Sequence, residues 1–163
     1  MREYINKYFR DYANSDFRVD SIGDLSKLAP DLQEDIAKLK EASKDKTGIH
    51  LTIAMNYGGR DEIKRAVQKI AQEVKDGKLD PEDITEDIIS DHLDSGGTPD
   101  PELIIRTSGE LRTSNFLMWQ SAYSEYYITD KLWPDFTIDD LKEAISSYQG
   151  RDRRFGGRNE AMK

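Results

Sequence analysis

Cysteine is absent from this 163-residue chain, and histidine occurs only twice. The absence of cysteine excludes disulfides and thiolate metal sites. His50 and His92 have no partner at the spacing of metal ligands, so neither is assigned a role. No apolar run approaches the ~20 residues that a membrane-spanning helix needs, and no signal-peptide pattern starts the sequence. Together these features suggest a cytoplasmic protein.

The charge balance is acidic, with 32 acidic and 24 basic residues and a formal net charge of −8. Such a balance disfavours general nucleic-acid binding. The glycine strings of the Walker and Rossmann phosphate loops are also missing, which argues against a generic nucleotide binder. The length fits one domain with a sizeable core.

Strand and helix patterns alternate along the chain. Short apolar or alternating runs predict strands at residues 17–22, 49–55, 103–106 and 126–129, the third of them buried. Helical spacing of apolar residues predicts helices at residues 1–13, 30–39, 63–74, 80–93 and 115–123, and a last one after a capping box at Thr137 and Asp140. This order predicts an α/β fold with a mainly parallel sheet flanked by helices.

Two polar segments directly follow predicted strands, and ligands of open parallel sheets gather beyond the carboxyl ends of the strands. The first segment is NYGGR at residues 56–60. Its glycines allow close approach of the backbone to a ligand, although a tight turn with a surface arginine explains the same pattern.

The second segment is RTSGELRTS, which begins at Arg106. Arginine presents a fixed fork of donors that matches two phosphate oxygens. This segment therefore predicts a site for a strongly anionic ligand such as a diphosphate. The site would consist of Arg106, Arg112 and the hydroxyls of Thr113 and Ser114. The alternative is that both arginines are surface residues paired with the many acidic side chains.

Longer motifs carry a resemblance to a family. RTSGELRTSNFLMWQ followed by SEYY and LWPDF, AMNYGGRDEI at residues 54–63, and RDRRFGG at residues 151–157 resemble the cis-prenyltransferases. The similarity is greatest to bacterial undecaprenyl diphosphate synthases (isoprenyl transferases) and runs from about residue 17 to residue 157. It implies an Mg²⁺-dependent transferase that condenses isopentenyl diphosphate onto an allylic diphosphate, with cis double bonds. The implied product is a long polyprenyl diphosphate of the undecaprenyl type, a carrier lipid for cell-wall synthesis.

The resemblance also implies roles for single residues. Arg106, Arg112, Thr113 and Ser114 would bind the diphosphate of isopentenyl diphosphate, and Glu125 would help to hold Mg²⁺. Arg154 and Gly156 match an Arg-X-Gly element that reaches the diphosphate region across a dimer interface. The family therefore predicts a homodimer, with residues 119–127 as the candidate interface, and a peripheral membrane contact through the lipid product.

Two elements of the family pattern are missing: a His-Met-Asp-Gly-Asn-Gly-Arg phosphate loop and an Asn-Trp-Arg-Pro element. Some members also carry a histidine where Leu111 stands. The resemblance thus implies that residues 1–163 are the C-terminal part of one cis-prenyltransferase domain, truncated at the N-terminus, with no catalytic residue of its own and no activity in isolation. The alternative is a non-catalytic partner subunit that supplies the Arg-X-Gly tail to a catalytic cis-prenyltransferase.

Overall fold

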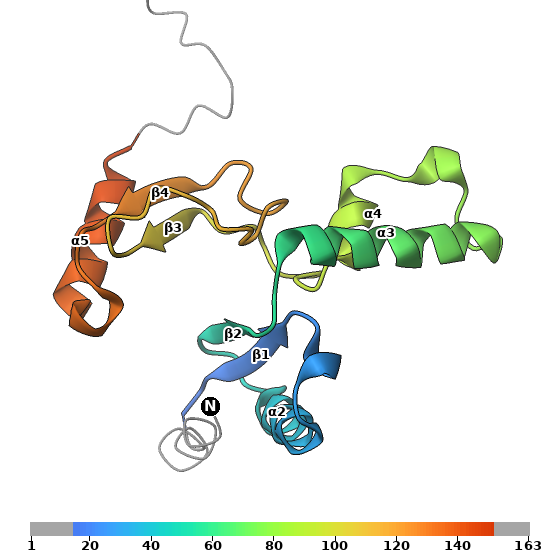
Figure 1. The fold of residues 1–163 in the computed structure, drawn as a ribbon, viewed down its shortest axis with the longest axis horizontal. Helices are drawn as coiled ribbons and strands as arrows, with labels where there is room; N and C mark the ends of the chain where they lie inside the picture. The colour runs from blue at the N-terminus through green and yellow to red at the C-terminus, as the bar shows by residue number, and fades with distance from the viewer. Residues whose placement is uncertain (1–14, 152–163) are drawn as a thin grey trace, which may run out of the picture. The chain divides into compact units, whose positions relative to one another are not determined.

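A computed structural model describes residues 15–151 of the chain. The chain divides into two compact units, Met1–Gly96 and Gly97–Lys163 (Figure 1). The helix predicted at residues 1–13 and the site residues Arg154 and Gly156 lie outside the described residues.

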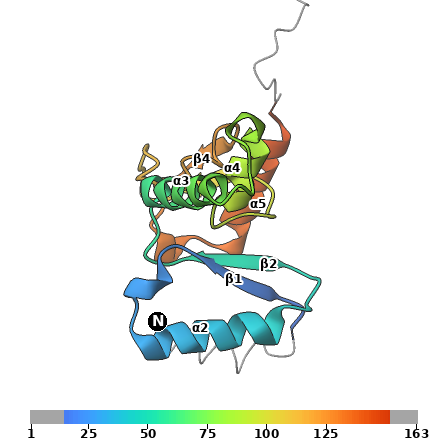
Figure 2. The same cartoon turned by 90° about the vertical axis from the view of Figure 1, so that its right-hand side faces the viewer.

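The first unit begins with a strand–helix–strand arrangement. Strand β1 (Arg18–Ile22) pairs in parallel with β2 (His50–Ala54), with Arg18 opposite His50 and Ile22 opposite Ala54. Between them, α2 (Pro30–Ser43) starts with a proline, whose fixed φ suits the first helical turn, and lies along β1 (Figure 2). A short 3-10 helix at Leu25–Lys27 precedes α2. These elements confirm the strands and the helix predicted in this region.

The long helix α3 (Gly59–Lys75) follows β2 and ends just before Gly77, which has a φ of 70°. The helix predicted at residues 80–93 is wrong in its first half. A 3-10 helix at Pro81–Asp83 is followed by extended backbone, and α4 (Glu86–His92) starts only after its N-cap, Thr85. The Thr85 side chain accepts the Ile88 amide, which fixes the start of α4 at this point.

Nearly all of the buried apolar side chains lie in the first unit; in the described part of the second unit only Ala144 qualifies. The buried face of α3 is shifted from the predicted one, because Val67 is 54% exposed whereas Glu62, Ala66 and Ile70 are buried. All five residues of β2 are exposed despite their alternating pattern. The buried apolar residues of the first unit are Val19, Ile22, Ile36, Leu39, Met55, Ala66, Ile70 and Leu93.

The second unit contains another parallel pair, β3 (Leu103–Arg106) and β4 (Glu125–Ile128). Both strands are half-buried, so the expectation of a fully buried strand at residues 103–106 is wrong. Helix α5 (Ile138–Gln149) packs beside them (Figure 1) and begins with the predicted capping box of Thr137 and Asp140. Before it, a 3-10 helix spans Trp133–Asp135, and Trp133 stacks on Phe136 with ring centroids 5.9 Å apart. Parallel strands flanked by helices confirm the predicted fold class.

The segment between β3 and β4 does not form the helix predicted at residues 115–123. It is a series of turns in which Ser114, Asn115 and Leu117 have φ values of 49°, 65° and 47°. Positive φ is incompatible with a continuing right-handed helix. Of the described residues, no helix combines the length and the apolar character needed to cross a membrane.

Candidate functional site

The carboxyl end of β3 leads into a turn that the chain holds firmly. Arg106 is the last residue of β3. The next turn is anchored to the continuation of β4, because the Ser108 amide donates to the Lys131 carbonyl at 2.8 Å and the Gly109 amide donates to the Thr129 carbonyl at 2.9 Å. Gly109 has a φ of 64°, and a Cβ there would lie 2.8 Å from a carboxylate oxygen of Asp130. A side chain at position 109 would therefore be strained.

A cavity of about 260 Å³ opens beside this turn. Arg106, Arg112 and Thr113 line it together with apolar walls. Its size lies just below the ~300 Å³ at which pockets for small molecules commonly begin, so it suits a compact headgroup such as a diphosphate. The apolar walls are Ile104, Ile105, Phe116 and Tyr126.

One hydrogen bond joins two of the predicted site residues, and the other two contact neighbouring side chains. The Arg106 Nη2 donates to the Ser114 hydroxyl at 3.2 Å, and the Thr113 hydroxyl lies 3.6 Å from the Met118 sulfur. Arg112 is 63% exposed and pairs with the carboxylate of Glu110. The structure thus brings four of the predicted residues to one place, and Glu110 adds a carboxylate that the sequence analysis did not place there.

Glu125 lies elsewhere in the same unit. It is the first residue of β4 and stands opposite Leu103, three residues from Arg106 in the register of the parallel pair. At ~3.3 Å per residue, the two ends of the pair are about 10 Å apart. The Glu125 carboxylate accepts a hydrogen bond from Arg151 Nη1 at 2.7 Å, and Glu125 does not line the arginine cavity.

A metal site is not complete within the described residues. No group of three or more His, Cys, Asp or Glu side chains there could hold a metal ion. Mg²⁺ can be held by one or two carboxylates plus substrate phosphates, but Glu125 already pairs with Arg151. The described residues therefore do not fit an Mg²⁺ site by themselves, and no chemical step is assigned to a metal here.

The first unit contains a polar network that the sequence analysis missed. Arg65 donates from Nη1 and Nη2 to the two carboxylate oxygens of Asp94, each at 2.6 Å. Asp94 also accepts the Gly23 amide at 2.9 Å, and its own amide donates to the buried carboxylate of Glu62. The hydrogen bond to Asp94 raises the pKa of the Arg65 guanidinium. Burial would raise the pKa of Asp94, but the hydrogen bonds from Arg65 and Gly23 outweigh it and lower that pKa.

One signal in the sequence could have identified Glu62. It is spaced four residues from Ala66 and eight from Ile70, which are both buried on the same face of α3. A carboxylate on the apolar stripe of a helix must be hydrogen-bonded, because an unpaired buried carboxylate is very costly.

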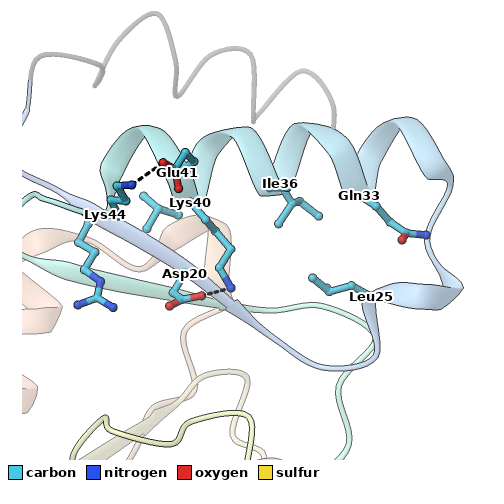
Figure 3. A pocket seen from close by; sticks show the side chains of 10 residues that line it. Asp20, Leu25, Gln33, Ile36, Lys40, Glu41 and Lys44 are labelled. Atoms are coloured by element: carbon cyan, nitrogen blue, oxygen red, sulfur yellow. Dashed lines mark hydrogen bonds and ion pairs between the residues drawn. The ribbon is translucent and has the colours of Figure 1, made fainter.

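A second cavity, of about 450 Å³, lies between β1 and α2 (Figure 3). Four of its charged side chains pair with one another in Figure 3: Lys40 reaches Asp20, and Lys44 reaches Glu41. The part of β1 that lines this cavity is its first half. Of the turn that follows β1, only Leu25 lines it. These properties make it a weaker candidate for an anion site than the arginine cavity.

Comparison with known proteins identifies the family. The family model described as "Putative undecaprenyl diphosphate synthase" matches residues 1–156. The chain belongs to this family, the cis-prenyltransferases. An isoprenyl transferase from Streptococcus thermophilus is 52% identical over 159 residues, which cover 95% of this chain and 64% of that protein.

Two crystal structures are also similar to this cis-prenyltransferase chain. Lavandulyl diphosphate synthase from Lavandula x intermedia, in complex with dimethylallyl diphosphate, has a TM-score of 0.86 and 39% identity over 95% of this chain and 66% of its own. A "probable undecaprenyl diphosphate synthase" from Campylobacter jejuni has a TM-score of 0.84 and 30% identity over 95% and 70%. The chain spans less than two thirds of the length of the curated relatives that it matches first.

Proposed function

We propose that this chain acts in (Z)-selective prenyl transfer, as part of a cytoplasmic isoprenyl transferase of the undecaprenyl diphosphate synthase type. Its substrates would be isopentenyl diphosphate and an allylic diphosphate, and its product a long polyprenyl diphosphate that serves as a cell-wall carrier lipid. The observation that carries this proposal is the cavity lined by Arg106, Arg112 and Thr113, in a chain of the cis-prenyltransferase family.

The arginine cavity would hold the diphosphate of isopentenyl diphosphate. Arg106 is fixed by its position at the end of β3 and by its hydrogen bond to Ser114, so its guanidinium is already oriented. Arg112 is exposed and would exchange Glu110 for phosphate oxygens. A substrate held in this way loses its freedom before the reaction, which is the main contribution that a positioning site makes.

Departure of the allylic diphosphate needs additional groups. In the family this diphosphate is bound by the phosphate loop, and the 163 residues contain no such string. We therefore propose that the 163-residue chain alone binds diphosphate but does not catalyse the condensation. Glu125 would contribute one Mg²⁺ ligand after release from Arg151, and Arg154 and Gly156 would act in a homodimer.

Titration calorimetry with inorganic pyrophosphate tests the binding site. The wild-type chain should bind, and Arg112→Ala should weaken binding about tenfold or more, because a hydrogen bond to a charged group contributes roughly 1.5–3 kcal/mol. Arg18→Ala is the matched control, because Arg18 lines the other cavity. Equal losses in both variants would indicate a general charge effect and refute the assignment of the site.

An activity assay tests the second part of the proposal. The chain is incubated with farnesyl diphosphate, labelled isopentenyl diphosphate and Mg²⁺, and labelled polyprenyl product is extracted and counted. We expect no turnover. Turnover of roughly 1 s⁻¹ or more, which is ordinary for an enzyme, would show that the chain needs no further segment. Activity that appears only when a second family member is added would favour the partner-subunit alternative.

A further inference from the structure

Asp140 is the one buried charged side chain among the described residues of the second unit, with 9% of its surface exposed. It lies in the first turn of α5, where its carboxylate completes the capping box with Thr137. The pKa of Asp140 is lowered to about 2, first by the hydrogen bond from Lys131 and then by those from Thr137. A helix cap needs only the contacts to Thr137, so the contact to Lys131 needs a separate explanation.

The two oxygens of the Asp140 carboxylate have different partners. Lys131 Nζ donates to Oδ1 at 2.5 Å, whereas the amide and the hydroxyl of Thr137 donate to Oδ2 at 2.8 and 2.7 Å. One oxygen therefore caps α5, and the other binds Lys131. Because the carboxylate is buried and hydrogen-bonded on both oxygens, it has little freedom to move.

The backbone of Lys131 anchors the turn that joins the two arginines of the cavity. The Ser108 amide donates to the Lys131 carbonyl at 2.8 Å, and the Gly109 amide donates to the Thr129 carbonyl at 2.9 Å. Lys131 therefore binds Asp140 with its side chain and the turn with its main chain. A displacement of Lys131 would also displace the turn.

The turn needs such an anchor, because its backbone is strained. Ser108 has a φ of 67° and Gly109 a φ of 64°. The left-handed region is rare for residues with a side chain, and a serine stays there only when its surroundings hold it. The turn lies between Arg106 and Arg112 in the chain, and both arginines line the cavity of about 260 Å³. Loss of the anchor would thus allow the two guanidiniums to move relative to each other.

We propose that Asp140 is a positioning residue, which acts through Lys131 to hold the turn at residues 107–109. The fixed turn sets the spacing of Arg106 and Arg112 for a diphosphate. This inference rests on the proposed function, because it assumes that a diphosphate occupies the arginine cavity. Asp140 and Lys131 do not line that cavity. Loss of their contact should therefore weaken diphosphate binding without removing a group that touches the ligand, because a preorganised site binds better than one that must first be ordered.

The test is the substitution Lys131→Met, which removes the ion pair and leaves the capping box in place. Hydrogen exchange, followed residue by residue by NMR, measures how firmly the turn is held. The Ser108 and Gly109 amides should exchange about fivefold faster, a change within the range for residues coupled through one hydrogen-bond network. Amides within α5 should be unchanged, because its cap remains. Lys131→Arg keeps the charge and the donors and should restore slow exchange.

Calorimetry with inorganic pyrophosphate measures the consequence for binding. Lys131→Met should reduce the affinity about fivefold, and Lys131→Arg should restore it. Lys142→Met is the matched control, because it removes the same charge from a lysine that pairs with Asp139 on α5, where the two side chains are 69% and 83% exposed. The control should reduce the affinity by less than about twofold, because exposed pairs contribute little, and should leave the exchange of the Ser108 and Gly109 amides unchanged.

The outcomes separate this inference from the function on which it rests. No pyrophosphate binding by the wild type would refute the proposed function and, with it, this inference. Binding that depends on Arg112, with unchanged affinity or unchanged amide exchange in Lys131→Met, would refute the positioning role alone. Faster exchange throughout the second unit would also refute that role, because Lys131 would then contribute to general stability. Equal losses of affinity in Lys131→Met and Lys142→Met would refute it too, since net charge would explain both.

Discussion

The Arg65 guanidinium donates to both carboxylate oxygens of Asp94, with Nη1–Oδ1 and Nη2–Oδ2 distances of 2.6 Å each. The two side chains are 24% and 13% exposed, so the pair is largely shielded from water. A two-pronged pair with this geometry is stronger and more specific than a single contact. It joins α3 to the segment after α4 and, through the Gly23 amide, to the end of β1.

Asp94→Asn should destabilise the first unit. The amide cannot accept both prongs of Arg65, and a hydrogen bond to a charged group contributes about 2 kcal/mol. Urea unfolding followed by circular dichroism at about pH 7 measures the loss. Glu34→Gln is the control, because Glu34 is 67% exposed and its pair with Lys38 spans one helical turn; it should produce no measurable change.

The Arg65–Asp94 pair also predicts that the unfolding free energy depends on pH in the acidic range. The pKa of Asp94 is lowered in the folded chain, because the hydrogen bonds from Arg65 and Gly23 outweigh the effect of burial. The stabilisation is therefore fully present above the unfolded pKa of about 3.9 and is lost as the pH falls through the lower folded value. The difference in unfolding free energy between the wild type and Asp94→Asn should shrink below about pH 4. A constant difference would contradict this account.

The surroundings of His92 predict that the unfolding free energy depends on pH near neutrality. Its Nδ1 lies 2.7 Å from the Ile88 carbonyl and its Nε2 lies 3.2 Å from the Glu73 carboxylate, so both ring nitrogens face acceptors. Only the protonated ring can donate to both. The hydrogen bond to Ile88, and then that to Glu73, raise the pKa of His92, while burial and, to a smaller extent, Lys69 oppose the shift.

Because the pKa of His92 is raised in the folded chain, its contribution to stability decreases as the pH rises. The stabilisation from His92 is fully present below about pH 6.5, the ordinary value, and is lost as the pH rises through the higher folded value. Unfolding free energies of the wild type and of His92→Gln should therefore converge as the pH rises from about 6 to about 9. Parallel curves would show that the pKa of His92 is the same in the folded and the unfolded chain.

Thr137→Ala should destabilise α5. The Thr137 side chain accepts the Asp140 amide, and the Asp140 carboxylate accepts both the amide and the hydroxyl of Thr137. Loss of an N-cap of this kind costs about 1 kcal/mol. Thr137→Ser keeps the hydroxyl and should retain most of the stability. Urea unfolding of the three proteins gives the comparison, and equal stabilities would mean that the cap does not limit the stability of this unit.

The chain should associate with itself. Exposed apolar side chains are numerous in the second unit: Tyr123 is 67% exposed and Trp133 is 71% exposed. Large exposed apolar surfaces commonly mark contact sites. Sedimentation at micromolar concentration should show a dimer or a larger species. Tyr123→Arg, within the candidate interface at residues 119–127, should dissociate it, whereas Val67→Arg on α3 should not. A monomeric wild type would refute the prediction.

Local signals predicted some elements well. Gly23 ended β1 and Pro30 opened α2 because each residue limits its own backbone directly. The apolar spacing around Trp119 predicted a helix, but Leu117 has a positive φ, and tertiary contacts override a helical pattern of this length. Arg106 and Arg112 line one cavity because only a short loop joins them, and a local motif contains that information. The buried carboxylate of Glu62 accepts a hydrogen bond from Asp94, 32 residues away, and no local pattern contains that information.

Both tryptophans, Trp119 and Trp133, lie in the second unit, after the division at Gly96. Tryptophan dominates the intrinsic fluorescence of a protein, so an emission-based melting curve would report the unit that holds the arginine cavity and would miss events around Glu62. A reporter for the first unit must therefore be added to it. Val67, exposed on α3, is a suitable position for one. A Val67→Trp chain would give each unit an optical signal, so that the unfolding of the two units could be timed separately.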